Sequence, residues 1–192
     1  VYISKTARDY DVYSVSTSNE NATYDMTKYL IENNHQDIAL IMTSKEDTIL
    51  EMERRTGYER ALRDNNIDVR SELIKYGNTD YEGGYNSMKE LIEEKIRPSA
   101  VFVTGDEAAV GAINAIFDSG YSVPEDISVA GFNDTKLAKI YRPKLTTVFQ
   151  PLFDMGAVSI RALIKLINGE PVEEKKIELP YQIMERESVI KK

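Results

Sequence analysis

The stretch AVFVTGDEAAVGAINAIFDSG, residues 100–120, joins two different sequence patterns at one glycine. Its first five residues are apolar without alternation, which is typical of a strand covered on both faces. After Gly105, four apolar residues fall on one helical face: Ala109, Ile113, Ile116 and Phe117. Gly120 stands where the end of a helix favours glycine. The stretch therefore predicts a strand that leads into a helix, with Asp106 as the helix cap.

The same alternation of short apolar and longer amphipathic runs continues on both sides of this unit. The short runs predict strands at 38–42, 72–75, 100–104 and 127–130. The longer runs predict helices at 48–64, 81–95, 106–119 and 152–168, the last one preceded by Pro151. Successive strands start about 30 residues apart, the length of one βα unit. The sequence therefore predicts an α/β fold with a parallel sheet flanked by helices and right-handed crossovers.

Two pieces at the ends of the chain do not fit a simple βα count. Strand-like segments at 1–4 and 12–15 come first, and extended residues at 177–189 follow the last helix. That helix carries a predicted core stripe: Leu152, Gly156, Ile160, Leu163 and Ile167. A domain that starts in mid-pattern and ends with an extra helix indicates part of a larger, two-lobed fold.

The composition excludes several classes of function. The 192 residues include no cysteine and one histidine, so disulfides, thiolate metal sites, His-rich zinc sites and a Ser-His-Asp triad are excluded. With 24 basic and 32 acidic residues, the net charge of −8 opposes DNA binding by this chain alone. No apolar run approaches the ~20 residues that span a bilayer, so no membrane association is expected.

Known catalytic motifs are missing as well. The chain has no G-x-S-x-G elbow, no P-loop and no H-E-x-x-H motif. Its carboxylates are spaced as on solvated helix faces, and Gly83-Gly84 is typical of a turn or a helix start. His35 follows a predicted helix end, where either a favoured cation or simple packing explains it. The residues therefore predict binding without turnover: no enzyme, no cofactor and no metal.

Polar loops follow the predicted strands, at 43–45, 77–79, 105–106 and 132–134. The carboxyl ends of parallel strands form the usual ligand edge of an open sheet, and amides, hydroxyls and carboxylates suit sugars or nucleosides. Arg54, within the helix predicted after the first strand, could reach the same edge. A plainer reading is that Asn133 and Asp106 only close turns and cap helices.

The last predicted helix carries a second polar candidate. Asp154, Val158, Arg161 and Lys165 form one stripe. Like charges at i and i+4 slightly destabilise a helix. Arg161 and Lys165 therefore indicate either a solvated face or a surface for an anionic partner, such as a phosphorylated protein.

Several motifs together resemble the LacI/GalR family of bacterial regulators. They are GDEAAVGAINAI (105–116), SVPEDISVAGFND (122–134), RPKLTTVFQP (142–151) and LPYQIMERES (179–188). The resemblance implies the type I periplasmic-binding-protein fold, an effector in the cleft between two lobes and an N-terminal helix-turn-helix domain that binds DNA as a dimer. It assigns residues 1–17 and 150–178 to a partial N-terminal lobe, and residues 18–149 with the terminal strand at 179–192 to a complete C-terminal lobe.

The resemblance also implies roles for individual residues of the cleft. Arg54 matches the arginine that meets the effector, and Gln150 matches a glutamine of the hinge. Asn133, after the aromatic Phe132, stands where many sugar-responsive members have an aspartate. Gly105 replaces an asparagine of several members, and Thr79 stands where a stacking aromatic is common. The expected effector-binding set is Arg54, Gly105, Asp106, Phe132, Asn133 and Gln150.

Two interaction surfaces follow from the same resemblance. In the catabolite-control subgroup the corepressor is the serine-phosphorylated phosphocarrier HPr, and its docking helix matches Asp154, Arg161 and Lys165. This chain departs from the subgroup at Phe153 and Gln182, which replace a tyrosine and an arginine. The family dimer interface maps onto three further residues, for which core packing is the alternative: Val110, Leu137 and Tyr141.

The resulting hypothesis is an effector- and corepressor-sensing, dimerising core of a cytoplasmic regulator of carbohydrate metabolism. Its effector would be a sugar, a sugar phosphate or a similar small molecule, and DNA would be bound only through an N-terminal domain that this chain lacks. The alternative is an exported sugar-binding protein of a transporter, which shares the fold. The terminal LPYQIMERES favours the regulator. A helix-turn-helix or a secretory signal upstream of Val1 would separate the two.

Overall fold

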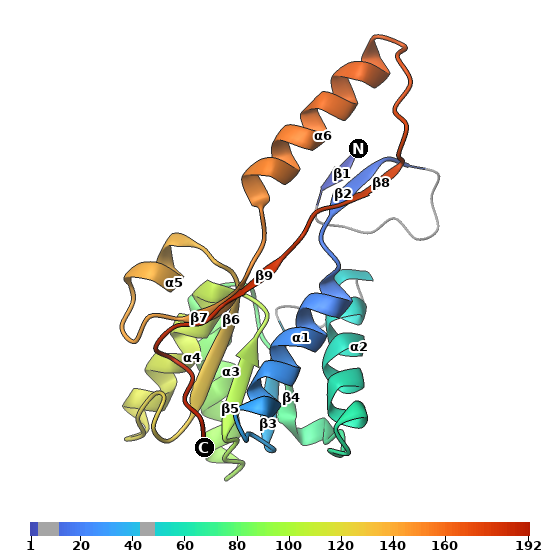
Figure 1. The fold of residues 1–192 in the computed structure, drawn as a ribbon. Helices are drawn as coiled ribbons and strands as arrows, with labels where there is room; N and C mark the ends of the chain where they lie inside the picture. The colour runs from blue at the N-terminus through green and yellow to red at the C-terminus, as the bar shows by residue number, and fades with distance from the viewer. Residues whose placement is uncertain (4–11, 43–48) are drawn as a thin grey trace.

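The computed structural model describes residues 1–3, 12–42 and 49–192, and its strands form two sheets (Figure 1). The strands of the larger sheet are β3 (Ile38–Met42), β4 (Ile74–Tyr76), β5 (Ala100–Val103), β6 (Ser128–Asn133), β7 (Thr146–Phe149) and β9 (Gln182–Met184). Their order is β4-β3-β5-β6-β7-β9, and neighbours are parallel except β7 and β9. The predicted parallel α/β architecture is therefore confirmed.

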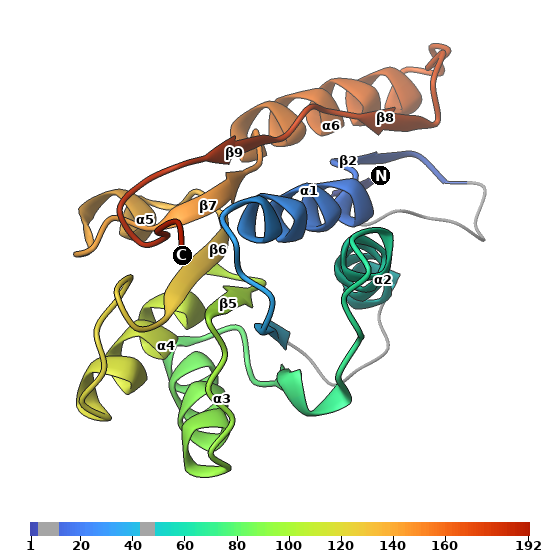
Figure 2. The same cartoon turned by 60° about the horizontal axis from the view of Figure 1, so that its bottom comes forward.

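Four helices cover the two faces of this sheet (Figure 2). On one face lie α1 (Asn19–Glu32) and α2 (Ile49–Asp64), and on the other lie α3 (Tyr81–Glu93) and α4 (Asp106–Asp118). The strand β3 serves both layers, because Ile38, Leu40 and Met42 join the α1–α2 core while Ala39 and Ile41 join the α3–α4 core. Burial of every residue of β3 explains why its sequence shows no alternation.

Glycines let the helices of each pair approach closely. A Cβ at Gly111 of α4 would lie 2.0 Å from the carbonyl oxygen of Tyr81, and one at Gly84 of α3 would lie 1.8 Å from that of Ala108. Gly57 of α2 meets the Glu20 carbonyl oxygen in the same way, at 2.1 Å. The helix-start reading of Gly83-Gly84 is confirmed, since the capping side chain of Asp80 accepts a hydrogen bond from the Gly83 N–H. These glycines serve packing as well as turn formation.

The predicted strand boundaries shift at two places. Residues 71–73 form a short 3-10 helix, η1 (Ser71–Leu73), so β4 begins later than expected. The strand β6 begins at Ser128 and continues to Asn133, which brings Phe132 and Asn133 into the sheet. A short helix, α5 (Lys136–Ile140), then leads to β7. The predicted loop 43–45, Ser4 and Thr48 lie outside the described residues.

The smaller sheet contains β1 (Tyr2–Ile3), β2 (Ser14–Ser16) and β8 (Lys176–Glu178), all parallel, in the order β1-β2-β8. The long helix α6 (Leu152–Ile167) packs on it through Met155, Ser159 and Ala162. The predicted core stripe was therefore wrong: Leu152, Ile160, Leu163 and Ile167 are 40–74% exposed. The helix turns its smaller side chains to the three-stranded sheet, and no element of the described chain covers the apolar stripe beside them.

Three segments pass between the two sheets (Figure 1). They connect β2 to α1, β7 to α6 and β8 to β9. The first and third run side by side, because the Leu179 N–H donates to the Ser16 carbonyl oxygen at 2.8 Å. The expected lobe boundaries at 17, 149 and 178 stay a prediction. Within the described ranges, no helix combines the length and the apolar character needed to cross a bilayer.

Candidate functional site

Arg54 lies buried at the carboxyl ends of β5 and β6. Only 6% of its surface is exposed, and its guanidinium carbon lies 4.2 Å from the centroid of the Phe132 ring. Its Nη1 donates to the Thr104 carbonyl oxygen at 3.1 Å and lies 3.8 Å from Glu51 Oε1. Burial lowers the pKa of Arg54 to about 10, with Glu51 and Glu53 opposing that effect. The guanidinium therefore stays charged at neutral pH and is held by a ring, a carbonyl and a carboxylate.

One donor of this guanidinium is left over. Arg54 Nε is buried and has no hydrogen-bond partner among the residues that the structure describes. A buried donor without an acceptor costs about 1–3 kcal/mol. This donor makes Arg54 a candidate contact for a ligand oxygen, and its role in effector binding stays a prediction. Phe132 is fully buried beneath Arg54, so it supports the guanidinium from below.

A chain of side-chain hydrogen bonds leads from the end of β6 to the segments between the sheets. Gln150 Nε2 donates to Asn133 Oδ1 at 3.1 Å, and Gln150 Oε1 accepts from the Thr17 hydroxyl at 3.0 Å. Thr17 follows β2 and Gln150 follows β7, so this relay joins two of the three connecting segments. Asn133 has φ 108°, a left-handed conformation that few side chains adopt, which fits a specialised position. Two predicted pairs thus form at the end of β6: Arg54 with Phe132, and Asn133 with Gln150.

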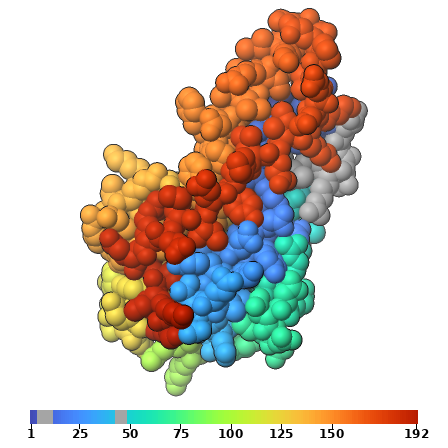
Figure 3. Space-filling model, in the orientation of Figure 1, coloured from blue at the N-terminus to red at the C-terminus, as the bar shows by residue number. Residues whose placement is uncertain are grey.

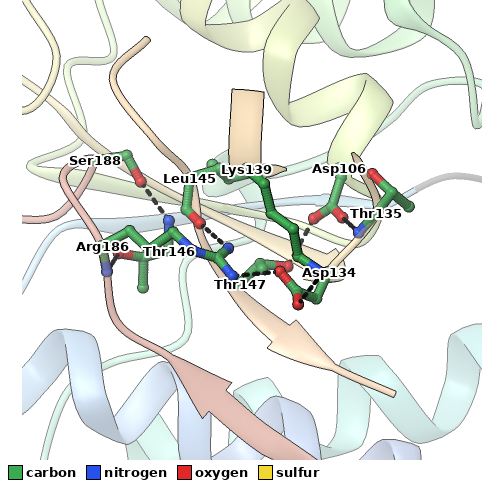
Figure 4. Close-up of polar contacts among 9 residues, drawn as sticks. All are labelled: Asp106, Asp134, Thr135, Lys139, Leu145, Thr146, Thr147, Arg186 and Ser188. Carbon is green, nitrogen blue, oxygen red and sulfur yellow. Dashed lines mark hydrogen bonds and ion pairs between the residues drawn. The ribbon is translucent and has the colours of Figure 1, made fainter. Parts of the chain in front are cut away.

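Both carboxylate oxygens of Asp106 already accept hydrogen bonds from other residues of the chain (Figure 4). It is 1% exposed, its Oδ1 accepts from the Thr147 hydroxyl at 2.6 Å, and its Oδ2 accepts from the Thr135 N–H at 2.6 Å. Burial is the main cause that raises its pKa, and these hydrogen bonds oppose it. The predicted capping role was wrong, since Gly105 is the N-cap of α4 and no side chain caps it. Asp106 instead ties the β6–α5 turn to β7, and its role as an effector contact stays a prediction.

A second buried carboxylate explains the terminal RES motif (Figure 4). Asp134, at φ 53°, accepts from Arg186 Nη2 at 2.6 Å and lies 3.0 Å from Lys139 Nζ. Arg186 Nη1 also donates to the Leu145 carbonyl oxygen at 2.8 Å. Ser188 donates to the Val129 carbonyl oxygen at 2.6 Å and accepts from the Thr146 N–H at 2.8 Å. Arg186 and Ser188 therefore fasten the end of the chain to the strand ends that carry the site.

The predicted partner residues lie on the exposed side of α6. Asp154 and Arg161 line a shallow groove of about 280 Å³. Its other walls are Pro151, Ala157, Val158, Leu179 and Pro180. Lys165 is also exposed and follows Arg161 by one helical turn. The structure thus places two of the three charges at one groove, with the third beside it.

The dimer candidates differ in exposure. Val110 is 7% exposed within α4, whereas Leu137 and Tyr141 are half-buried at α5. The Tyr141 hydroxyl donates to Asn114 Oδ1, and Asn114 Nδ2 donates to the Tyr81 hydroxyl at 2.9 Å. Two large apolar side chains nearby are exposed: Phe117 (40%) and Ile140 (56%). The geometry leaves both readings open for Val110, core packing and interface contact.

Sequence reasoning missed several residues of this region. Thr17 and Thr104 were not predicted, and neither was the pair of Asp134 and Arg186, although Arg186 stands in the motif LPYQIMERES (179–188). In the described part of the chain, no group of three His, Asp or Glu side chains could hold a metal ion.

Comparison with known proteins identifies the family. The model of the periplasmic binding protein-like domain matches residues 27–189. The chain is similar to the crystal structure of the transcription regulator CcpA of Lactococcus lactis, with a TM-score of 0.90 and 34% sequence identity. The match covers 97% of this chain and 68% of that chain. A sugar-binding regulator of the LacI family from Escherichia coli, solved with phosphate, has a TM-score of 0.87 and 28% identity, over 99% of this chain and 68% of that chain. The chain belongs to the LacI family of transcriptional regulators.

A curated relative of this LacI-family chain is the catabolite control protein A of Priestia megaterium. The two are 38% identical over 175 residues, which is 91% of this chain and 53% of the relative. The chain thus spans about half the length of the curated relatives it matches. The resemblance that the sequence motifs indicate is confirmed, and so is the periplasmic-binding-protein-like fold.

Proposed function

We propose that this LacI-family chain is the effector-sensing and dimerising core of a bacterial regulator of carbohydrate metabolism. The single observation that carries this proposal is the buried Arg54, which has a spare donor next to a hydrogen-bond relay from Asn133 to the connecting segments. The polar groups around Arg54 suit the binding of a ligand, and the described residues of this region show no nucleophile–base pair, so the proposed action is binding and not catalysis. The relatives compared above are regulators, which supports a cytoplasmic protein whose DNA contacts lie in another domain.

The mechanism is a population shift between arrangements of the two sheets. A ligand that hydrogen-bonds Arg54 and Asn133 competes with Gln150 Nε2 for Asn133 Oδ1, and Gln150 is in turn held by the Thr17 hydroxyl. Binding therefore favours one geometry of the connecting segments over another. A differential affinity of about 1–3 kcal/mol suffices for a useful response. In a dimer, such a change would alter the spacing of two DNA-binding domains.

The ligand class is a sugar, a sugar phosphate or a similar small molecule. The charged Arg54 and the polar relay suit hydroxyl and phosphate oxygens, and the Escherichia coli regulator compared above was solved with phosphate. The half-buried Leu137 and Tyr141, with the exposed Ile140, support a homodimer through α5.

Replacing Arg54 with alanine is expected to weaken the binding of such ligands about tenfold or more, because hydrogen bonds to a charged group contribute about 1.5–3 kcal/mol. The measurement is the increase in the melting temperature of the protein on addition of each member of a panel of sugars and sugar phosphates. Arg63→Ala on the same helix is the matched control, since Arg63 is exposed and, among the described residues, its side chain bonds only Glu59. Equal shifts for wild type and Arg54→Ala would refute the assignment of the cleft.

The groove of α6 is the proposed docking site for serine-phosphorylated HPr. Arg161 and Lys165 supply the positive charge for a phosphate group, and Ala157, Val158 and Leu179 supply apolar contact. Arg161→Glu is expected to abolish the binding heat in titration calorimetry with serine-phosphorylated HPr, because it places a negative charge opposite the phosphate. Lys89→Glu, an exposed helix cation on α3, is expected to leave the affinity unchanged. An Arg161→Glu variant that binds like wild type would rule this surface out.

A further inference from the structure

A second crevice opens at the opposite end of the larger sheet from Arg54. Ile38, at the start of β3, lines it, whereas Arg54 contacts the Thr104 carbonyl just past the end of the parallel strand β5. The crevice lies where α1 and α2 end, and these two helix ends lie side by side along the lower edge of the molecule (Figure 3). Its volume of about 590 Å³ falls within the usual range of small-molecule sites.

The floor of the crevice is apolar and its rim is polar. The floor residues are Ile31, Ile38, Tyr58, Leu62, Ile67 and Leu73. On the rim, the carboxylate of Asp37 is paired with Arg70 at 2.8 Å. The exposed side chains of Gln36, Asn66 and Asp68 make no hydrogen bond or ion pair to any residue that the structure describes. The rim therefore offers two free amides and one free carboxylate, without excess positive charge.

A buried histidine at the crevice adds an unmet acceptor. His35 is fully buried, and its Nε2 lies 2.9 Å from the Ile190 carbonyl oxygen, so Nε2 carries the proton. Its Nδ1 has no partner within the described residues. Burial lowers the pKa of His35, which keeps the imidazole neutral and its Nδ1 able to accept. His35 therefore forms a buried, neutral part of the crevice wall, and the packing reading of His35 holds over the cation reading.

These groups select a class of ligand. Amides and a carboxylate bind hydroxyls that both donate and accept, and an apolar floor fits the C–H face of a sugar ring. The unpaired carboxylate of Asp68 opposes a phosphate or carboxylate ligand. We infer that this crevice is a second binding site, separate from the cleft, for a neutral saccharide. Both sites lie along α2, which carries Arg54 in its first half and Leu62 in its last turns.

The test is a titration of the isotope-labelled chain with cellobiose, followed in amide nitrogen–proton NMR spectra. Saccharide in the crevice shifts the amides of residues 34–37 and 65–70. The Arg54→Ala variant shows the same shifts with the same affinity, which distinguishes this site from the proposed cleft. Asp68→Ala combined with Gln36→Ala lowers the affinity about tenfold, because two rim hydrogen bonds are lost.

Glu32→Gln is the matched control, since Glu32 is an exposed carboxylate of α1 that does not line the crevice. It leaves the titration unchanged. The proposal is overturned if cellobiose shifts no amide in 34–37 and 65–70, if the rim variant binds as well as wild type, or if inorganic phosphate produces the same shifts. A failure of the cleft proposal would instead appear as the absence of any ligand response at Asn133.

Discussion

Replacing Arg186 with leucine is expected to lower the free energy of unfolding by about 3 kcal/mol or more. Arg186 and Asp134 have side chains that are 14% and 3% exposed, and their 2.6 Å contact fastens the terminal segment to the end of β6. Without the guanidinium, the buried Asp134 carboxylate keeps only Lys139, whose side chain is 54% exposed. Urea denaturation monitored by circular dichroism measures the change.

Arg142→Leu is the matched control for this prediction. Arg142 is an exposed arginine of the same region, and within the described ranges its guanidinium donates only to the carbonyl oxygens of Ile140 and Tyr141. Its replacement is expected to change the unfolding free energy by less than about 0.5 kcal/mol. If the Arg186 and Arg142 variants were equally stable, the buried pair would not be what holds the terminal motif.

The second large effect is expected at the contact of α3 and α4. A valine at Gly111 would place its Cβ 2.0 Å from the Tyr81 carbonyl oxygen, and backbone cannot move aside as a flexible side chain can. The two helices must separate, which we expect to cost at least about 3 kcal/mol or to leave the variant insoluble. Differential scanning calorimetry of the purified variant measures the change in the melting temperature.

In contrast to Gly111→Val, the substitution Gly156→Ala is expected to raise the stability of the chain. Gly156 lies inside α6, and a Cβ added there meets no atom within 4 Å from any described residue beyond its own stretch of helix. Because alanine is the better helix former, this variant is expected to gain about 0.5–1 kcal/mol. A Gly111→Val variant that melts at the temperature of wild type would contradict the close helix contact.

The sequence predicts the βα units well, because each unit is decided by contacts within about 30 residues. Three strand–helix units, around 38, 72 and 100, follow from apolar runs and turn residues. For the helix α1, only its end before His35 was predicted and its start was not, although Ser18 caps it and Ala22, Met26 and Leu30 are spaced by four. The strand β7 was missed as well, since its short run TTVF carries only two strongly apolar residues.

The wrong core stripe of α6 has a different cause. The helix has an apolar stripe and a neighbouring row of small and flexible residues, and periodicity alone does not say which one meets a sheet. The structure places Met155, Ser159 and Ala162 against the smaller sheet and leaves Ile160 and Ile167 exposed. The choice between the two depends on tertiary contacts that local spacing does not contain.

The location of the candidate site could be predicted, but not its internal bonds. The carboxyl-end rule places Arg54 and Asn133 at one edge of the sheet. The relay through Gln150 joins residues that are 133 positions apart, and Asp106 finds its partners 29 and 41 positions away. Such long-range side-chain pairs leave no local pattern, so the sequence could not show that Asp106 is already occupied.

The central claim is that a ligand at Arg54 and Asn133 changes how the two sheets are arranged. Because the chain has no cysteine, spin labels can be placed at introduced cysteines, one at Lys28 on α1 and one at Asn168 after α6. Double electron–electron resonance spectroscopy then measures the distance between the two spin labels. The measurement is made with and without a sugar or sugar phosphate that raises the melting temperature. The account predicts a shifted distance distribution in the wild-type background and an unshifted one with Arg54→Ala. A stabilising ligand that leaves the wild-type distribution unchanged would contradict it.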